Sequence, residues 1–92
     1  MITLLLQTYL CLLSYSGIAQ KAACWLLIQV RQSGKTRIRI PESVSNWAMV
    51  LNVSRSSLHR ELKKMEIDRI IKYTPPVIEI LDAEALQNTL NH

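Results

Sequence analysis

Residues 43–66 contain two short helical patterns separated by a tight turn, and this arrangement constrains the fold more than any other feature of the chain. The first pattern follows Ser43, whose hydroxyl can accept a backbone N–H of the first helical turn. The second follows Ser54, which can cap a helix that begins at Arg55 in the same way. Two helices this close along the chain are expected to pack against each other as a helix-turn-helix.

The residues around the turn are suited to that packing. Ala48 is small enough to let the two helices approach closely, and Leu51 and Val53 can fill the space beneath the turn. Leu58 and Leu62 recur at helical spacing and can hold the second helix against the first. The first helix is expected to bury an apolar face, and the turn is expected to be fixed by apolar contacts on both sides.

The second helix is amphipathic and unusually basic. Leu58, Leu62 and Met65 recur at spacings of four and three residues, so they lie on one face of a helix. A basic run of this kind is often only a helix face exposed to solvent. Whether it is a binding surface must be judged from the neighbouring segments of the sequence. The polar and basic side chains on the remaining faces are Arg55, Ser56, His59, Arg60, Lys63 and Lys64.

Charge and composition narrow the classes of function. The 92 residues include 11 Lys and Arg against 7 Asp and Glu, which gives a net charge of +4. A basic balance suits an anionic partner such as nucleic acid or a membrane surface. A Gly-rich phosphate loop is not possible with glycine only at Gly17 and Gly34, and no nucleophile–base–acid set stands out. We therefore do not expect an enzyme.

The two cysteines, Cys11 and Cys24, lie thirteen residues apart in sequence with a helical pattern. We expect them to be small buried apolar side chains rather than a disulfide or part of a metal site. The chain has two histidines and no C-x-x-C motif, so no zinc site can be assembled from a recognisable pattern. No metal and no cofactor are expected.

Residues 1–16 are strongly apolar and allow three interpretations. A transmembrane helix is disfavoured, because polar residues interrupt the segment and a span needs about 20 apolar residues. A secretory signal peptide is disfavoured because no Lys or Arg precedes the apolar stretch, although residues 17–19 end it with small residues. The third interpretation is a helix that pairs two copies of the chain, and its alternative is burial against the core of its own domain.

The spacing of the apolar residues favours the dimerisation helix. They recur at alternating steps of three and four, as in the seam of a coiled coil. A helix this apolar cannot leave its surface exposed to water, so it requires a partner surface. The side chains expected at the dimer interface are Ile2, Leu5, Leu6, Tyr9, Leu12 and Leu13.

The rest of the chain predicts a mainly helical domain over residues 17–92 that carries a small β-hairpin. A helix-turn-helix followed by a two-stranded hairpin is a winged helix, so the predicted fold is a winged helix-turn-helix preceded by the apolar helix of residues 1–16. The elements expected around the two central helices are a helix over residues 18–33 ended by Gly34, a strand over residues 37–40, strands over residues 70–73 and 77–81 joined by a proline-containing turn, and a last helix over residues 83–90 capped by Asp82.

Several motifs then point to a known family. The segment LNVSRSSLHREL at residues 51–62 fits the pattern L-x-V-S-R-x-x-[VL]-x-R-x-L, and VIEILDAEAL follows the proline turn. With Trp25-Leu26-Leu27, Ile38-Arg39-Ile40-Pro41 and Ser43, these motifs resemble the C-terminal DNA-binding domain of the Crp/Fnr family of bacterial transcription regulators. The resemblance covers residues 17–90.

The resemblance implies a recognition helix at about residues 54–66 that enters the major groove of double-stranded DNA. It places Arg55 and Arg60 at the positions where the family contacts bases and phosphates. It also implies a cytoplasmic homodimer with no membrane partner. Shorter hydrogen bonds could come from Ser54, Ser56, Ser57 and His59, whereas Lys63 and Lys64 suit phosphates or solvent.

The chain departs from the family pattern in three ways. Ser56 stands where many members have Glu, so their familiar operator does not carry over. Pro75-Pro76 occupies the wing tip, where Gly or a basic residue is usual. No β-roll sensor fits in 92 residues, so the chain is either a fragment or a short protein without a sensor, and no effector site is expected in it. The alternatives to a DNA-binding domain are a winged-helix module that binds an acidic protein, and a membrane-associated or secreted peptide driven by residues 1–16.

Overall fold

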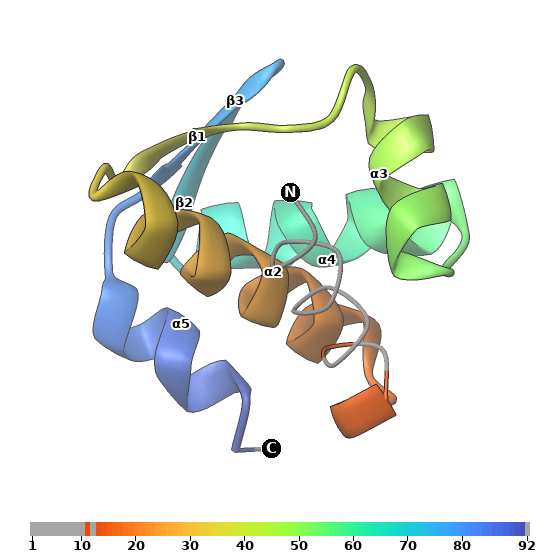
Figure 1. The fold of residues 1–92 in the computed structure, drawn as a ribbon, viewed down its shortest axis with the longest axis horizontal. Helices are drawn as coiled ribbons and strands as arrows, with labels where there is room; N and C mark the ends of the chain where they lie inside the picture. The colour runs from red at the N-terminus through yellow and green to blue at the C-terminus, as the bar shows by residue number, and fades with distance from the viewer. Residues whose placement is uncertain (1–10, 12, 92) are drawn as a thin grey trace.

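The computed structural model describes residue 11 and residues 13–91. They form a small winged helix in which helices pack against a three-stranded antiparallel sheet (Figure 1). The elements, in chain order, are α2 (Ile18–Ser33), β1 (Arg37–Arg39), α3 (Val44–Leu51), α4 (Arg55–Ile67), β2 (Ile71–Thr74), β3 (Val77–Ile80) and α5 (Ala83–Thr89). The predicted fold class is confirmed.

The ends of α2 follow from the two glycines. The backbone N–H of Gly17 donates to Oε1 of Gln20 at 3.2 Å, which gives the start of the helix a side-chain cap. Gly34 ends the helix with φ at 71°, a left-handed conformation that suits a residue without Cβ. Its N–H donates to the carbonyl of Val30 at 2.8 Å, so the predicted stop at Gly34 is confirmed.

The sheet has three antiparallel strands in the order β1-β3-β2. The sequence predicted only the hairpin of β2 and β3 and left the first strand without a partner. In the structure β1 pairs with β3, and Ile38 lies opposite Ile78. This pairing joins residues about forty positions apart and places both isoleucines in the core, where each is at most 5% exposed.

One hydrophobic core connects the sheet to the helices. Helix α2 packs against β1, and α4 packs against β2. Trp25 of α2 and Trp47 of α3 meet with ring centroids 5.1 Å apart and tilted planes, which ties the helix before the sheet to the first helix of the helix-turn-helix. Trp25 belongs to this core, since only 6% of it is exposed.

The expectation for the cysteines was wrong in one respect. Cys11 is buried as predicted, but its sulfur is bonded to that of Cys24 in a disulfide, with the two Cα atoms 5.9 Å apart. The sequence around each cysteine looked helical, and no local pattern in it indicated that the two side chains meet. The chain leaves the helical conformation at Tyr15 and Ser16, and this break lets Cys11 reach the side of α2.

The predicted dimer interface lies almost entirely outside the described residues. Leu13 is the one member of that set within them, and 66% of it is exposed. Within the described part of the chain, no helix is both long enough and apolar enough to cross a membrane.

The disulfide should contribute measurably to stability. A covalent loop between residues thirteen positions apart removes unfolded-state entropy worth about 3 kcal/mol in the chain-entropy model. We expect dithiothreitol to lower the midpoint of thermal unfolding by on the order of 10 °C. Circular dichroism melts with and without the reductant measure this shift. The double variant C11S/C24S is the control, because its midpoint should not respond to the reductant; an equal response would contradict the assigned disulfide.

Candidate nucleic-acid interface

The turn between α3 and α4 is fixed by a left-handed asparagine. Asn52 has φ of 59° and ψ of 46°, a conformation that Asn tolerates better than most residues. The N–H of Val53 then donates to the carbonyl of Ala48 at 2.9 Å, which closes the end of α3. Leu51 is fully buried beneath the turn. The chain therefore reverses within three residues, and α4 begins at Arg55.

Serine caps start both helices of the helix-turn-helix, as predicted. The hydroxyl of Ser43 accepts the N–H of Asn46 at 3.2 Å, and that of Ser54 accepts the N–H of Ser57 at the same distance. Each bond satisfies a backbone donor that has no partner within the helix. The cap at Ser54 therefore fixes the direction in which the exposed start of α4 leaves the turn.

The apolar face of α4 fixes its rotation about the helix axis. Leu58 and Leu62 are completely buried, and Met65 is 4% exposed. The remaining predicted site residues must therefore lie on the exposed faces, and the structure finds seven of the eight exposed, with Ser57 half-buried. Ser54 and Ser57 belong to the cap of the helix, and the other six fall into three groups by direction.

The first group faces the wing, which we define as β2, β3 and their turn. Arg55, His59 and Lys63 recur every four residues along α4 and line one groove of about 510 Å³. The start of α3 and the wing complete its walls, the latter with Tyr73, Pro75 and Pro76. The structure thus brings three predicted side chains together on one basic wall.

The second and third groups point elsewhere. Ser56 and Arg60 are four residues apart and exposed on the face of α4 that is turned away from the buried leucines. Lys64 lies on the opposite flank from the wing and lines a separate hollow of about 410 Å³ together with Glu61 and Asp68. Two acidic side chains therefore share the surroundings of Lys64, and the structure does not bring it together with Arg55.

Tyr73 is a site residue that the sequence interpretation missed. It projects from β2 against α4 and is 9% exposed. Its ring and the His59 ring form a T-shaped pair with centroids 6.2 Å apart, and Nζ of Lys63 lies 5.9 Å from the centroid of the Tyr73 ring. The only signal in the sequence was its inward position in the alternating segment IIKY.

Glu66 is the second missed residue, and it connects α4 to the wing. Its Oε2 accepts the backbone N–H of Tyr73 at 3.2 Å, and its Oε1 lies 3.4 Å from Nζ of Lys63. Burial raises the pKa of the Tyr73 hydroxyl; nearby Arg55 acts in the opposite direction, and Glu66 reinforces the rise. The phenol therefore remains neutral and able to donate a hydrogen bond throughout the neutral pH range.

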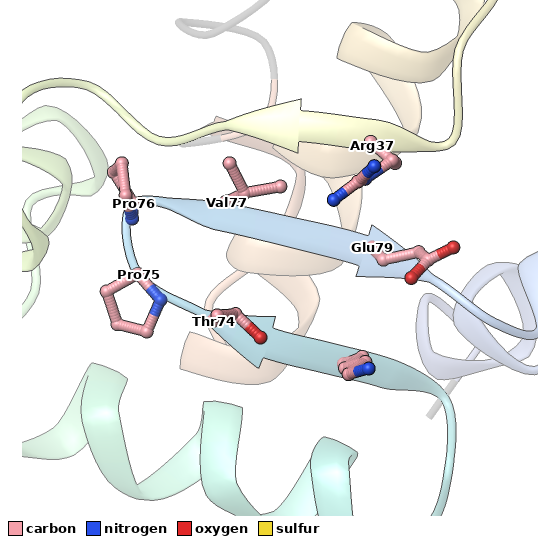
Figure 2. Close-up of a pocket in the computed structure, with 7 residues that line it drawn as sticks. Arg37, Thr74, Pro75, Pro76, Val77 and Glu79 are labelled. Carbon is pink, nitrogen blue, oxygen red and sulfur yellow. The ribbon is translucent and has the colours of Figure 1, made fainter.

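The wing tip, unlike the wall of the groove that α4 forms, carries no basic side chain. Figure 2 shows Pro75 and Pro76 in the turn between the two strands, next to Thr74. Proline has no backbone N–H and these side chains carry no charge, so the tip has little with which to hold an anion. Behind it, on the outward face of the sheet, Arg37 and Lys72 both lie opposite Glu79 in neighbouring strands.

The cap of α4 should be measurable as stability. Replacing Ser54 with Ala removes the acceptor for the N–H of Ser57, and we expect a loss of about 1 kcal/mol in the free energy of unfolding. Urea unfolding followed by circular dichroism measures it. Ser56→Ala is the matched control, because this exposed serine lies inside the helix, and it should change stability by less than about 0.5 kcal/mol. Equal losses in the two variants would contradict the capping role.

Comparison with known proteins places this geometry in context. Residues 20–89 match the family model of the Crp-like helix-turn-helix domain. A transcriptional regulator of the Crp/Fnr family from Eubacterium rectale has a similar structure, with a TM-score of 0.74, 20% identity and 99% of this chain covered. The catabolite activator protein of Thermus thermophilus is similar with a TM-score of 0.63, 17% identity and 98% coverage. No curated protein sequence gives a significant match.

The chain spans only part of these two proteins. It covers 39% of the Eubacterium rectale chain and 36% of the Thermus thermophilus chain. At these identities the likeness establishes the fold, and the matched family model establishes the domain.

Proposed function

Because the chain belongs to the family of Crp-like helix-turn-helix domains, which are DNA-binding domains of transcription regulators, we propose that it binds double-stranded DNA in a sequence-specific manner, with α4 as its recognition helix. One observation carries the proposal. The N-terminal half of α4 is capped and carries the exposed Arg55 and Arg60, while the apolar face of the helix is buried in the core. An α-helix of this size fits the major groove of B-DNA.

The N-terminal half of α4 supplies the groups that can read bases. A guanidinium can donate two parallel hydrogen bonds to O6 and N7 of guanine, or it can hold a phosphate. Ser56 and Arg60 lie on the outward face of the helix, and Arg55 lies at its start. The hydroxyls of Ser54 and Ser57 are engaged or half-buried at the cap, so they are better placed to support the backbone than to discriminate bases.

The remaining basic residues suit the DNA backbone. His59 and Lys63 lie along the wing-facing side of α4, one and two turns beyond Arg55. Lys64 lies on the other flank, where a second phosphate strand of the groove would pass. Such contacts add affinity without reading sequence, and they make binding dependent on salt.

We propose a homodimer as the functional form. Its interface would be the apolar segment of residues 1–16, with Ile2, Leu5, Leu6, Tyr9, Leu12 and Leu13 at the seam. Two copies would then present two recognition helices to the half-sites of an inverted repeat. The sensing of a signal would belong to a part of a regulator outside this chain.

The two arginines provide the test. We expect the double variant R55A/R60A to lose at least about 30-fold in affinity for a duplex that the wild-type protein selects, because each bidentate contact contributes about 1–3 kcal/mol. Fluorescence anisotropy with a labelled duplex measures the loss.

The matched control is the double variant R31A/K35A, which removes the same charge near the end of α2. It should bind nearly as well as the wild type. If both double variants weaken binding equally, net charge rather than the recognition helix holds the DNA, and the proposed role of α4 is wrong. If the wild-type protein selects no duplex, the protein-interaction alternative is favoured.

A further inference from the structure

We propose that Tyr73 is a positioning residue of the DNA interface, which holds Lys63 and His59 in the groove between α4 and the wing so that they contact a backbone phosphate. The inference deepens the proposed function and rests on it. It assigns the phosphate contact on the wing side to α4, since the tip of the wing has no charged group to make it.

The first step is the chemistry of the wing tip. Thr74, Pro75 and Pro76 form the exposed end of the hairpin (Figure 2). The two prolines have no N–H to donate, and only one hydroxyl is available among the three side chains. A phosphate beside the wing must therefore find its donors elsewhere. In the groove that Pro75 and Pro76 line, the basic wall is the one that α4 contributes. On the outward face of the sheet, Arg37 and Lys72 share their surroundings with Glu79.

The second step is the way in which the ring of Tyr73 meets that wall. His59 and Lys63 are one helical turn apart, and both lie against the ring, the first in a T-shaped pair and the second with Nζ 5.9 Å from the ring centroid. An ammonium over an aromatic ring is attracted by the ring's negative face. A flexible lysine held there loses less freedom when it binds than one that moves freely in solvent.

The third step is the anchor of Tyr73 itself. Its backbone N–H donates to Glu66 at 3.2 Å, and β2 is an edge strand of the sheet, so this bond attaches the wing to α4. Glu66 also lies 3.4 Å from Nζ of Lys63, whose side chain is 53% exposed. An ammonium has three donors, so Lys63 can keep the carboxylate and still donate to a phosphate from the open side of the groove.

The location of the groove links these contacts to DNA. Arg55 lies in the same wall as His59 and Lys63, and the groove also reaches Ser43 and Ser45 at the start of α3. A duplex with its major groove on the start of α4 would bring a phosphate strand along this wall. Glu42 is the one acidic side chain that lines the groove, and it already accepts a hydrogen bond from the side-chain amide of Asn46.

A double-mutant cycle tests the proposal, with anisotropy of a labelled duplex that the wild-type protein recovers from a random pool. Lys63→Ala should weaken binding about five-fold and lower the slope of log affinity against log salt by about one, as expected for the loss of one phosphate contact. In the background of Tyr73→Leu, the same Lys63→Ala substitution should cost less than about two-fold, because Lys63 is no longer held. Tyr73→Phe retains the ring and should restore the full effect.

Two controls separate positioning from folding. Lys72 precedes Tyr73 on β2 but faces the outward side of the sheet with Arg37 and Glu79, so Lys72→Ala should leave the salt slope and the cycle unchanged. Thermal melts report whether Tyr73→Leu destabilises the fold, and the cycle is measured at a temperature below the melting range of every variant. Equal costs of Lys63→Ala in the wild-type and Tyr73→Leu backgrounds overturn the proposal. Failure of the wild-type protein to bind any duplex instead overturns the proposed function.

Discussion

Burial of three side chains on one face of α4 is the constraint on which the arrangement of the interface depends. Leu58 and Leu62 are completely buried and Met65 nearly so, which is worth about 1.5–3 kcal/mol of hydrophobic stabilisation for each. Because a helix is rigid, fixing this face also fixes the directions of all the others. Arg55, His59 and Lys63 must then face the wing, and the outward face is left to Ser56 and Arg60. The direction of each basic side chain on the helix is thus a consequence of how its apolar stripe is packed.

The wing packs against α4 through polar as well as apolar contacts. Glu66 accepts the free N–H of an edge strand, while the ring of Tyr73 lies against two basic side chains of the helix. Edge strands present unpaired backbone groups, and this one is partly covered by the carboxylate. The same contacts place positive charge on a helix beside a wing tip that carries none. The outward face of the sheet is less positively charged than the basic wall of α4. Glu79 lies there between Arg37 and Lys72 in neighbouring strands and offsets part of their charge.

The sequence predicted the parts of the fold that depend on local patterns. The serine caps at Ser43 and Ser54, the stop at Gly34 and the buried stripe of α4 could all be read from neighbouring residues, and the structure confirms them. The pairing of β1 with β3 could not be read in this way, since it depends on register between segments far apart in the chain. The disulfide was missed because it depends on how the segment before the break at residues 15 and 16 lies against α2, which no local pattern shows. Tyr73 and Glu66 were missed for a related reason: each is unremarkable in its own segment, and their roles arise only where β2 meets α4. The predicted dimer residues lie outside the described part of the chain, apart from Leu13, and remain a prediction.

The most direct test of the account is a selection of duplexes from a random pool by the purified protein, combined with its mass in solution. The account predicts enrichment of an inverted repeat with half-sites about one helical turn apart, recovered by a protein with the mass of a dimer. That result would supply the operator and support both the recognition helix and the dimer. A folded protein that enriches no sequence, while its affinity for DNA depends only on salt, would contradict the claim that α4 reads bases in the major groove.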